Sequence, residues 1–186
     1  MIEGSDIDTL LVERIIREGD RSSFDELYNK YSKRVYNFCL NFLGNEEDAK
    51  DCTQEIFIKA FCSIGTFRQK STFYTWLYRI MINNCKDMYR KKGFRKVDLN
   101  MAGGIESDDR SAISRMITEK AIQAFHEALG KMSAEFRTVI ILRDIEGRSY
   151  SEISAITGTG EGTVKSRIAR ARRRMAEKLK DYKDEL

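Results

Sequence analysis

The chain has 186 residues, with 33 Lys and Arg against 29 Asp and Glu, and it contains no proline. An average composition would supply about nine prolines. Their absence excludes proline-rich linkers and polyproline ligands, and it means that every helix must begin and end by other means. No apolar run approaches the roughly 20 residues that a membrane span needs, and the acidic N-terminus does not resemble a signal peptide.

The four cysteines, Cys39, Cys52, Cys62 and Cys85, form no CxxC pair, and the single histidine, His126, stands apart from them. This pattern favours buried thiols in a reduced cytoplasmic protein over a disulfide or zinc framework, with redox sensing as a lesser alternative. No HExxH or two-metal pattern is present. The sequence therefore predicts no metal site, no cofactor and no intrinsic enzymatic activity.

Apolar residues recur every three or four positions along most of the chain, which predicts an all-α fold. Helices are expected from residue 24 to a stop at Gly44, from a cap at Asn45 to a break at Gly65, and from Ser71 or Thr72 onward. Further helices are expected around 116–130, 134–146, 149–157 and 161–181.

Basic side chains are concentrated in two blocks, 86–96 and 163–174, which flank an acidic stretch with a Gly-Gly pair. Residues 95–115 are predicted to form a flexible linker. We therefore expect two small helical domains, over 1–94 and 116–186.

The C-terminal pattern predicts a helix-turn-helix. Ser149 and Glu152 match a capping box, and a Gly-Thr-Gly turn precedes a helix with a basic outer face. The second helix of this motif enters the major groove, where Arg, Lys and small side chains read base edges. The outward residues are Lys165, Ser166, Ala169, Arg170 and Arg173. A solvated basic helix is the alternative, and a phosphate loop is disfavoured because no strand precedes the glycines.

Aromatic residues between 67 and 78 directly precede the first basic block. Aromatic faces beside a basic helix suit unstacked bases, and a flipped base needs polar groups that read its edge, which Asn83 is placed to supply. Core packing is the alternative for several of these aromatics, Trp76 above all. Phe67 and Tyr74 are therefore the better contact candidates.

Three linked segments resemble the extracytoplasmic-function (group IV) sigma factors of the sigma-70 superfamily, especially the sigma-E-like members. The segments are Phe67–Ile80 with Asn83, Asp87 and Arg90; Asp48–Phe57; and Phe136–Ile140 through Arg143, with Tyr150, Glu152 and Gly162–Arg167. The resemblance covers about residues 20–180 in the family's order. It implies a region 2 domain, a linker and a region 4 helix-turn-helix domain.

The resemblance implies a non-enzymatic sigma subunit of the bacterial cytoplasm that directs promoter-specific initiation. Its expected partners are core RNA polymerase (the β′ clamp coiled coil and the β flap), promoter DNA and an anti-sigma factor. It assigns −10 element contacts to Phe67, Arg68, Ser71, Tyr74, Trp76, Asn83 and Arg90. It assigns −35 element contacts to Ser149, Tyr150, Thr163, Lys165, Ser166, Arg167, Ala169, Arg170 and Arg173. It assigns polymerase contacts to Asp48, Asp51, Gln54, Glu55 and Phe57.

Two helix starts depart from the family, which often has Leu-Pro where this chain has Met132-Ser133 and proline where it has Gly160. Capping by Ser133, Ser149 and Thr159 is expected to set the starts instead. Two alternatives to a sigma factor remain open at this point. One is a stand-alone helix-turn-helix regulator, and the other is a nucleic-acid-processing enzyme that would use the acidic cluster at 46–55.

Overall fold

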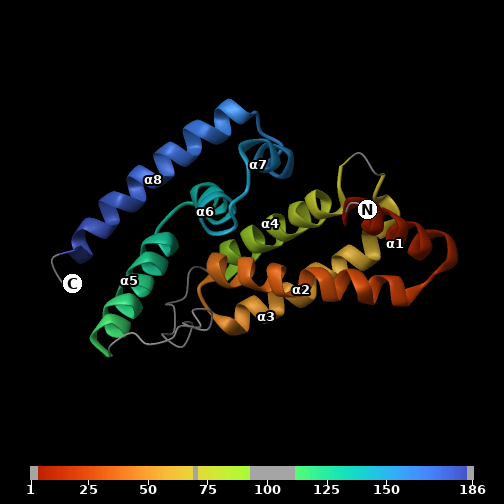
Figure 1. Cartoon of the computed structure of the whole chain (residues 1–186), viewed down its shortest axis with the longest axis horizontal. Coiled ribbons are helices and arrows are strands. Elements are labelled where there is room, and N and C mark those ends of the chain that lie inside the picture. The colour runs from red at the N-terminus through yellow and green to blue at the C-terminus, as the bar shows by residue number, and fades with distance from the viewer. Residues whose placement is uncertain (1–3, 69–70, 93–111, 184–186) are drawn as a thin grey trace.

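The computed structural model describes residues 4–68, 71–92 and 112–183, and all of its regular elements are helical (Figure 1). They are α1 (Gly4–Glu18), α2 (Arg21–Leu43), α3 (Glu46–Ser63), a 3-10 turn η1 (Ile64–Thr66), α4 (Phe73–Lys92), α5 (Ala112–Gly130), α6 (Ala134–Ile140), a π-helical turn η3 (Ile141–Ile145), α7 (Tyr150–Thr157) and α8 (Glu161–Lys183). The predicted all-α class, in two helical domains, is confirmed. No helix in the described ranges is long and apolar enough to cross a membrane.

Local signals set the helix ends of the N-terminal domain as predicted. Gly44 ends α2 in the left-handed conformation, with φ of 86°, which favours glycine. The Asn45 side chain caps α3 by accepting from the Asp48 backbone N–H at 2.8 Å. Of the two candidates for the α4 cap, Thr72 is the one used, because its hydroxyl accepts from the Thr75 N–H at 3.2 Å.

Helix α1 was not predicted from the sequence. Leu11, Val12 and Ile15 are buried, while Asp8 is only 3% exposed and accepts hydrogen bonds from Lys30 and Tyr31 of α2. The apolar spacing of 11, 12 and 15 is the signal that would have revealed this helix.

The N-terminal core lies where α2, α3 and α4 pack against one another (Figure 1). Its buried side chains sit at helical spacing on the inward faces, and each of those larger than alanine contributes roughly 1.5–3 kcal/mol on burial. They include Leu27, Val35, Phe38, Phe42, Ile56, Ala60, Leu77 and Met81.

The C-terminal helices begin partly by other means than predicted. The Ser149–Glu152 capping box is present, with bonds of 3.2 and 2.8 Å. The Ser133 prediction is wrong because its hydroxyl makes no capping bond. The Thr159 prediction is wrong because α8 begins at Glu161, which places Gly160, without a side chain, at the N-cap position. The Thr159 hydroxyl instead pairs with that of Thr157 at 2.9 Å.

The segment predicted as one helix over 134–146 is α6 continued by η3. The widened turn is closed by the Glu146 N–H, which donates to the Ile141 carbonyl five residues back at 2.9 Å. Helix α5 begins at Ala112, earlier than the expected start near 116. The rest of the predicted linker, 95–111, lies outside the described residues.

A buried arginine joins the two domains. Arg137 of α6 is 0% exposed, and its guanidinium donates to the Phe42 carbonyl of α2 at 2.6 Å. It also donates to the carbonyls of Leu129 and Gly130 and lies 4.3 Å from the Tyr89 ring of α4. One cation therefore ties the end of α5 to α2 and α4.

Candidate nucleic-acid and polymerase surfaces

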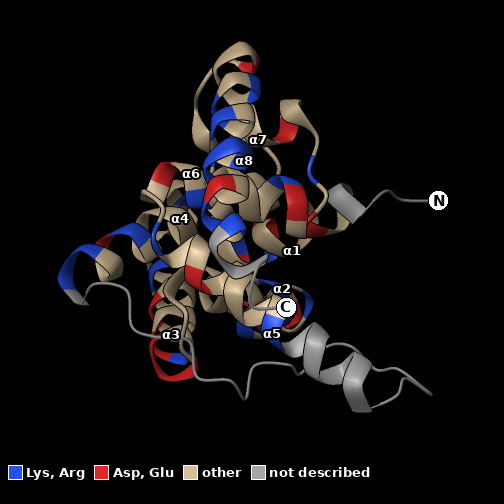
Figure 2. Ribbon diagram, turned by 90° about the vertical axis from the view of Figure 1, so that its left-hand side faces the viewer, with Lys and Arg blue, Asp and Glu red and all other residues tan. Residues whose placement is uncertain are grey.

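Helix α8 separates an apolar face from a basic face. Val164, Ile168, Ala171 and Met175 are buried against the rest of the C-terminal domain. The opposite face is exposed, and Figure 2 shows Lys and Arg distributed along the helix. The structure thus brings together on one surface, as predicted, the side chains of Thr163, Lys165, Ser166, Ala169, Arg170 and Arg173.

Not every basic residue of this block is available to a ligand. Arg172 is held by an ion pair with Asp144, whose carboxylate accepts from the arginine Nε at 3.1 Å. Arg167 is only partly exposed. By contrast, Arg170 keeps its side chain in solvent and makes a 3.3 Å bond from Nε to the Ser166 carbonyl. Arg170 and Arg173 are therefore the exposed arginines of the predicted face.

The other predicted −35 residues lie at the start of α7, beside α8. The Ser149 hydroxyl is occupied by its cap. The Tyr150 ring is half-buried between two cations, Arg143 at 4.8 Å and Lys165 at 5.5 Å. Such cation–π contacts hold the base of the helix-turn-helix together.

The predicted −10 residues divide into three groups. Arg68, Asn83 and Arg90 are exposed, and Ser71 is partly so. Phe67 is only 7% exposed, and it packs at 5.6 Å centroid distance against the half-buried Trp76. The sequence predicted that Phe67 is more accessible than Trp76. The structure shows the reverse, because Phe67 is buried and Trp76 is half-buried.

Tyr74, the remaining −10 candidate, lies in the contact between the domains. Its ring is 4.1 Å from that of Tyr78, and its hydroxyl donates to Glu146 of the C-terminal domain at 3.4 Å. The Arg148 guanidinium lies 4.3 Å from the same ring. Burial raises the pKa of the Tyr74 hydroxyl, so this group acts as a donor and not as a base.

The residues of α3 that are predicted to contact polymerase fall into an exposed group and a buried group. Asp51, Gln54 and Glu55 are exposed on one face of the helix. Asp48 is 2% exposed, and it accepts from the Asn45 side-chain amide at 2.6 Å. Phe57 is 5% exposed. These two serve the fold, while the three exposed residues remain able to contact a partner.

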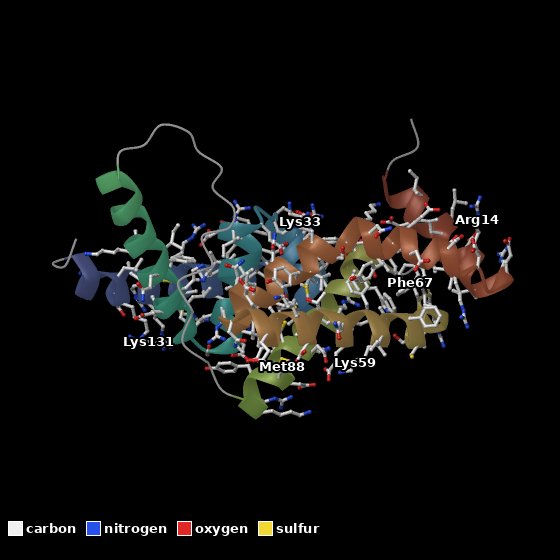
Figure 3. All side chains as sticks on the ribbon, turned by 90° about the horizontal axis from the view of Figure 1, so that it is seen from below. Arg14, Lys33, Lys59, Phe67, Met88 and Lys131 are labelled. Carbon is white, nitrogen blue, oxygen red and sulfur yellow. The ribbon has the colours of Figure 1, made fainter. Side chains whose placement is uncertain are left out.

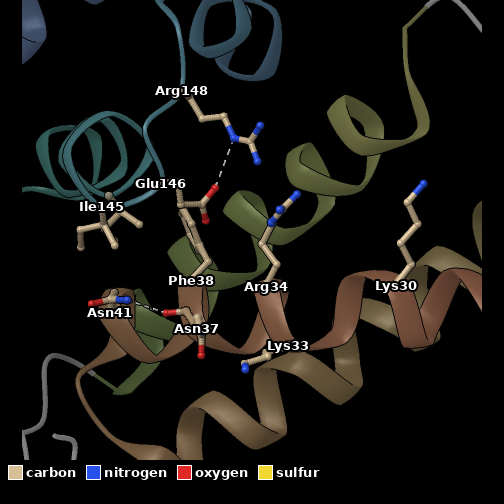
Figure 4. Close-up of a pocket in the computed structure, with 10 residues that line it drawn as sticks. Lys30, Lys33, Arg34, Asn37, Phe38, Asn41, Ile145, Glu146 and Arg148 are labelled. Carbon is tan, nitrogen blue, oxygen red and sulfur yellow. Dashed lines mark hydrogen bonds and ion pairs between the residues drawn. The ribbon is translucent and has the colours of Figure 1, made fainter. Parts of the chain in front are cut away.

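A basic cavity of about 450 Å³ opens between α2 and η3 (Figure 4). Lys30, Lys33, Arg34 and Arg148 line it, and Glu146 is the acid among them, with its carboxylate 3.6 Å from the Arg148 Nε. Burial raises the pKa of Glu146, while the Tyr78 hydrogen bond and Arg148 lower it. Nothing in the motifs pointed to Glu146, because its role depends on how the domains pack.

The cysteines follow the expectation of buried thiols in three cases out of four. Cys39, Cys52 and Cys85 are buried and Cys62 is exposed, and all four are free thiols. The sequence favoured buried thiols but gave no sign that three of them converge.

Two family models match the chain, Sigma-70 region 2 over residues 27–95 and Sigma-70 region 4 over residues 122–175. The chain is 36% identical over 178 residues to the RNA polymerase sigma-H factor of Pseudomonas aeruginosa, covering 89% of this chain and 90% of that one. It is 33% identical over 181 residues to the ECF RNA polymerase sigma-E factor of Escherichia coli K12, covering 92% and 94%.

Two solved structures share the fold. CnrH, in complex with the cytosolic domain of CnrY, matches with a TM-score of 0.70 and 27% identity, covering 95% of this chain and 99% of the other. The sigma factor RpoE of Bartonella quintana, in complex with the anti-sigma factor NepR, matches with a TM-score of 0.62 and 29% identity, covering 84% and 96%. The chain belongs to the extracytoplasmic-function RNA polymerase sigma factors, and it is an alternative sigma factor that directs transcription initiation.

Proposed function

We propose that this sigma factor reads the −35 element as duplex DNA through the exposed face of α8. The observation that carries the proposal is the convergence of Lys165, Ser166 and Arg170 on one solvent-facing surface near the start of the helix. Forked and short donors at this position suit the major-groove edges of bases. Arg167 and Arg173 flank the base-reading residues and are assigned to phosphates, which makes binding salt-dependent.

The −10 element is read on melted DNA by the exposed part of the α4 region. Asn83 supplies edge-reading groups for a flipped base, and Arg68 and Arg90 supply charge for the backbone. Phe67 and Trp76, which pack together, form the aromatic wall beside them, with Ser71 at its rim. No covalent chemistry is required of this chain, in accord with a non-enzymatic initiation factor of the bacterial cytoplasm.

Core RNA polymerase binds the exposed acidic face of α3, through Asp51, Gln54 and Glu55. Two similar proteins were solved with their anti-sigma partners, and we assign this chain an anti-sigma partner on that basis. Asp48 and Phe57 contribute indirectly, by holding the helix in place.

Promoter binding requires the two domains to separate. In the closed arrangement Tyr74 and Tyr78 are covered by Glu146 and Arg148, and the Arg79 guanidinium donates to the Ala155 carbonyl of α7 at 2.7 Å. A helix that is covered in this way is not free to contact a melted strand along its whole length. Separation exposes Tyr74 for the −10 role that the resemblance assigns to it.

The test is binding to promoter fragments with and without core polymerase, in an electrophoretic mobility shift assay. A sigma factor forms a promoter-specific complex that depends on core polymerase. A stand-alone helix-turn-helix regulator would instead bind its operator tightly without polymerase, and that result would overturn the proposal.

A further inference from the structure

Three buried thiols converge at the centre of the N-terminal domain, one from each of its packed helices. Cys39 lies in α2, Cys52 in α3 and Cys85 in α4, and each is 0% exposed. The Cys85 Sγ lies 3.7 Å from the Sγ of Cys39 and 3.7 Å from that of Cys52. All three sulfurs lie within 4.8 Å of one another. Neither pair is a disulfide.

These spacings match a three-coordinate metal site. A metal–sulfur bond of about 2.3 Å in a trigonal plane separates the sulfurs by about 4.0 Å. We propose that Cys39, Cys52 and Cys85 bind one soft monovalent cation, Cu(I), as a buried tris-thiolate site. The chemistry selects this ion because thiolates favour Cu(I), whereas structural zinc takes four ligands. Among the described residues, no His, Asp or Glu joins the three sulfurs.

Metal binding is a proton exchange at these sulfurs. When all three thiols are protonated, one Cu(I) displaces three protons, and no electron is transferred. Burial raises the pKa of the Cys39 and Cys85 thiols, whereas the contacts with these two thiols lower the pKa of Cys52.

The site has cations nearby to balance its anionic charge. Three thiolates around one Cu(I) leave two negative charges, and burying such charge is costly unless it is compensated. The charge of Lys59 on α3 lowers the pKa of Cys52, against the charge of Glu55, which raises it. Burial lowers the pKa of Arg137, while the charge of Cys85 raises it. Arg137 and Lys59 are therefore the cations whose charges act on the sulfurs.

The surface nearest to the site in sequence is the seam between α3 and α4, the helices that carry Cys52 and Cys85. A groove of about 470 Å³ follows this seam, and Lys59 and Met88 border it from the two helices (Figure 3). Asn84, next to Cys85 in sequence, also lines the groove, and its buried side-chain nitrogen has no hydrogen-bond partner in the described structure. The thioether of Met88 is a soft donor that an incoming Cu(I) ion can contact.

The first test titrates full-length protein with Cu(I) without oxygen, in competition with a chromophoric Cu(I) chelator. Cys62→Ala is the matched control, since Cys62 is the exposed thiol on the same helix as Cys52. Wild type and Cys62→Ala are both expected to bind one Cu(I) tightly. Cys39→Ala, Cys52→Ala and Cys85→Ala are each expected to weaken binding more than about 100-fold, because even outer partners of a metal site cost 10–100-fold. Equal affinity in all variants would overturn the proposal.

A second test needs no variant and so does not depend on whether the core substitutions fold. Copper-loaded wild type is examined by X-ray absorption spectroscopy and then by alkylation during unfolding, with mass spectrometry to locate the label. Three sulfur neighbours, with Cu(I) shielding all cysteines except Cys62, support the site. Two sulfur neighbours, shielding of Cys62, or a disulfide among the buried cysteines in place of bound copper would each contradict it.

Discussion

The hydroxyl of Tyr78 in α4 donates to both carboxylate oxygens of Glu146, at 3.2 and 3.0 Å. Tyr78 is 0% exposed, so the pair joins the buried face of the helix assigned to the −10 element to the C-terminal domain. Burial raises the pKa of both groups. These hydrogen bonds hold the N-terminal domain against the C-terminal domain.

The closed arrangement should weaken as pH rises. Because burial raises the pKa of Glu146 in the closed state, the neutral carboxyl favours closure. The stabilisation of the closed arrangement by the neutral carboxyl is complete below the ordinary glutamate pKa of 4.5. It is lost as pH rises through the raised pKa of Glu146. Energy transfer between dyes on exposed Cys62 and on a Lys180→Cys variant reports the separation. Glu146→Gln keeps a neutral side chain and should abolish the pH response; an unchanged response in that variant would contradict the assignment.

Substitution of Asp48 should mainly lower stability, whereas substitution of Glu55 should mainly weaken polymerase binding. Asp48→Ala removes the acceptor for the Asn45 amide and should lower the free energy of unfolding by about 1–2 kcal/mol. Glu55→Ala alters an exposed residue and should change stability by less than about 0.5 kcal/mol, while weakening association with core polymerase. Denaturant titration and a polymerase pull-down measure the two effects. The reverse pattern would place the polymerase face elsewhere.

Arg170→Ala should relax sequence choice at one base of the −35 element. Its exposed guanidinium is proposed to pair with a guanine edge, so the loss should be about 1–3 kcal/mol of discrimination at a single position. Binding to a panel of single-base variants by the polymerase holoenzyme measures it. Lys180→Ala, exposed on the same helix outside the predicted face, is the control. An equal loss for every sequence would make Arg170 a phosphate contact.

Asn83→Ala should impair opening of the −10 region and leave polymerase binding intact. Asn83 is exposed, whereas its neighbour Asn84 is buried and accepts from Lys59. Fluorescence of a 2-aminopurine base in the −10 element reports opening. Asn84→Ala should lower stability without a specific effect on opening. If the Asn83 variant opens promoters normally, the pocket for the flipped −10 base lies elsewhere.

Local rules explain what was predictable. The caps at Asn45 and Ser149 and the stop at Gly44 follow from side-chain chemistry within a few residues. The shared face of Lys165, Ser166 and Arg170 follows from helical geometry alone. These features do not depend on the rest of the fold, and the structure contains all of them.

Features that depend on packing between distant segments were not predictable from local patterns. The buried state of Asp48, the position of Tyr74 between the domains and the convergence of the cysteines all require the relative placement of several helices. Cys39 and Cys85 are 46 positions apart in sequence, and each alone reads as a small core residue. Ser133 matched a cap by sequence, yet its hydroxyl makes no capping bond.

The most direct measurement of the central claim is run-off transcription from genomic DNA fragments with purified core RNA polymerase. The account predicts discrete transcripts that require this protein, that start downstream of a common pair of −35 and −10 sequences, and that shift in choice with Arg170→Ala. Absence of any transcript that depends on the protein, with tight DNA binding in the absence of polymerase, would contradict it.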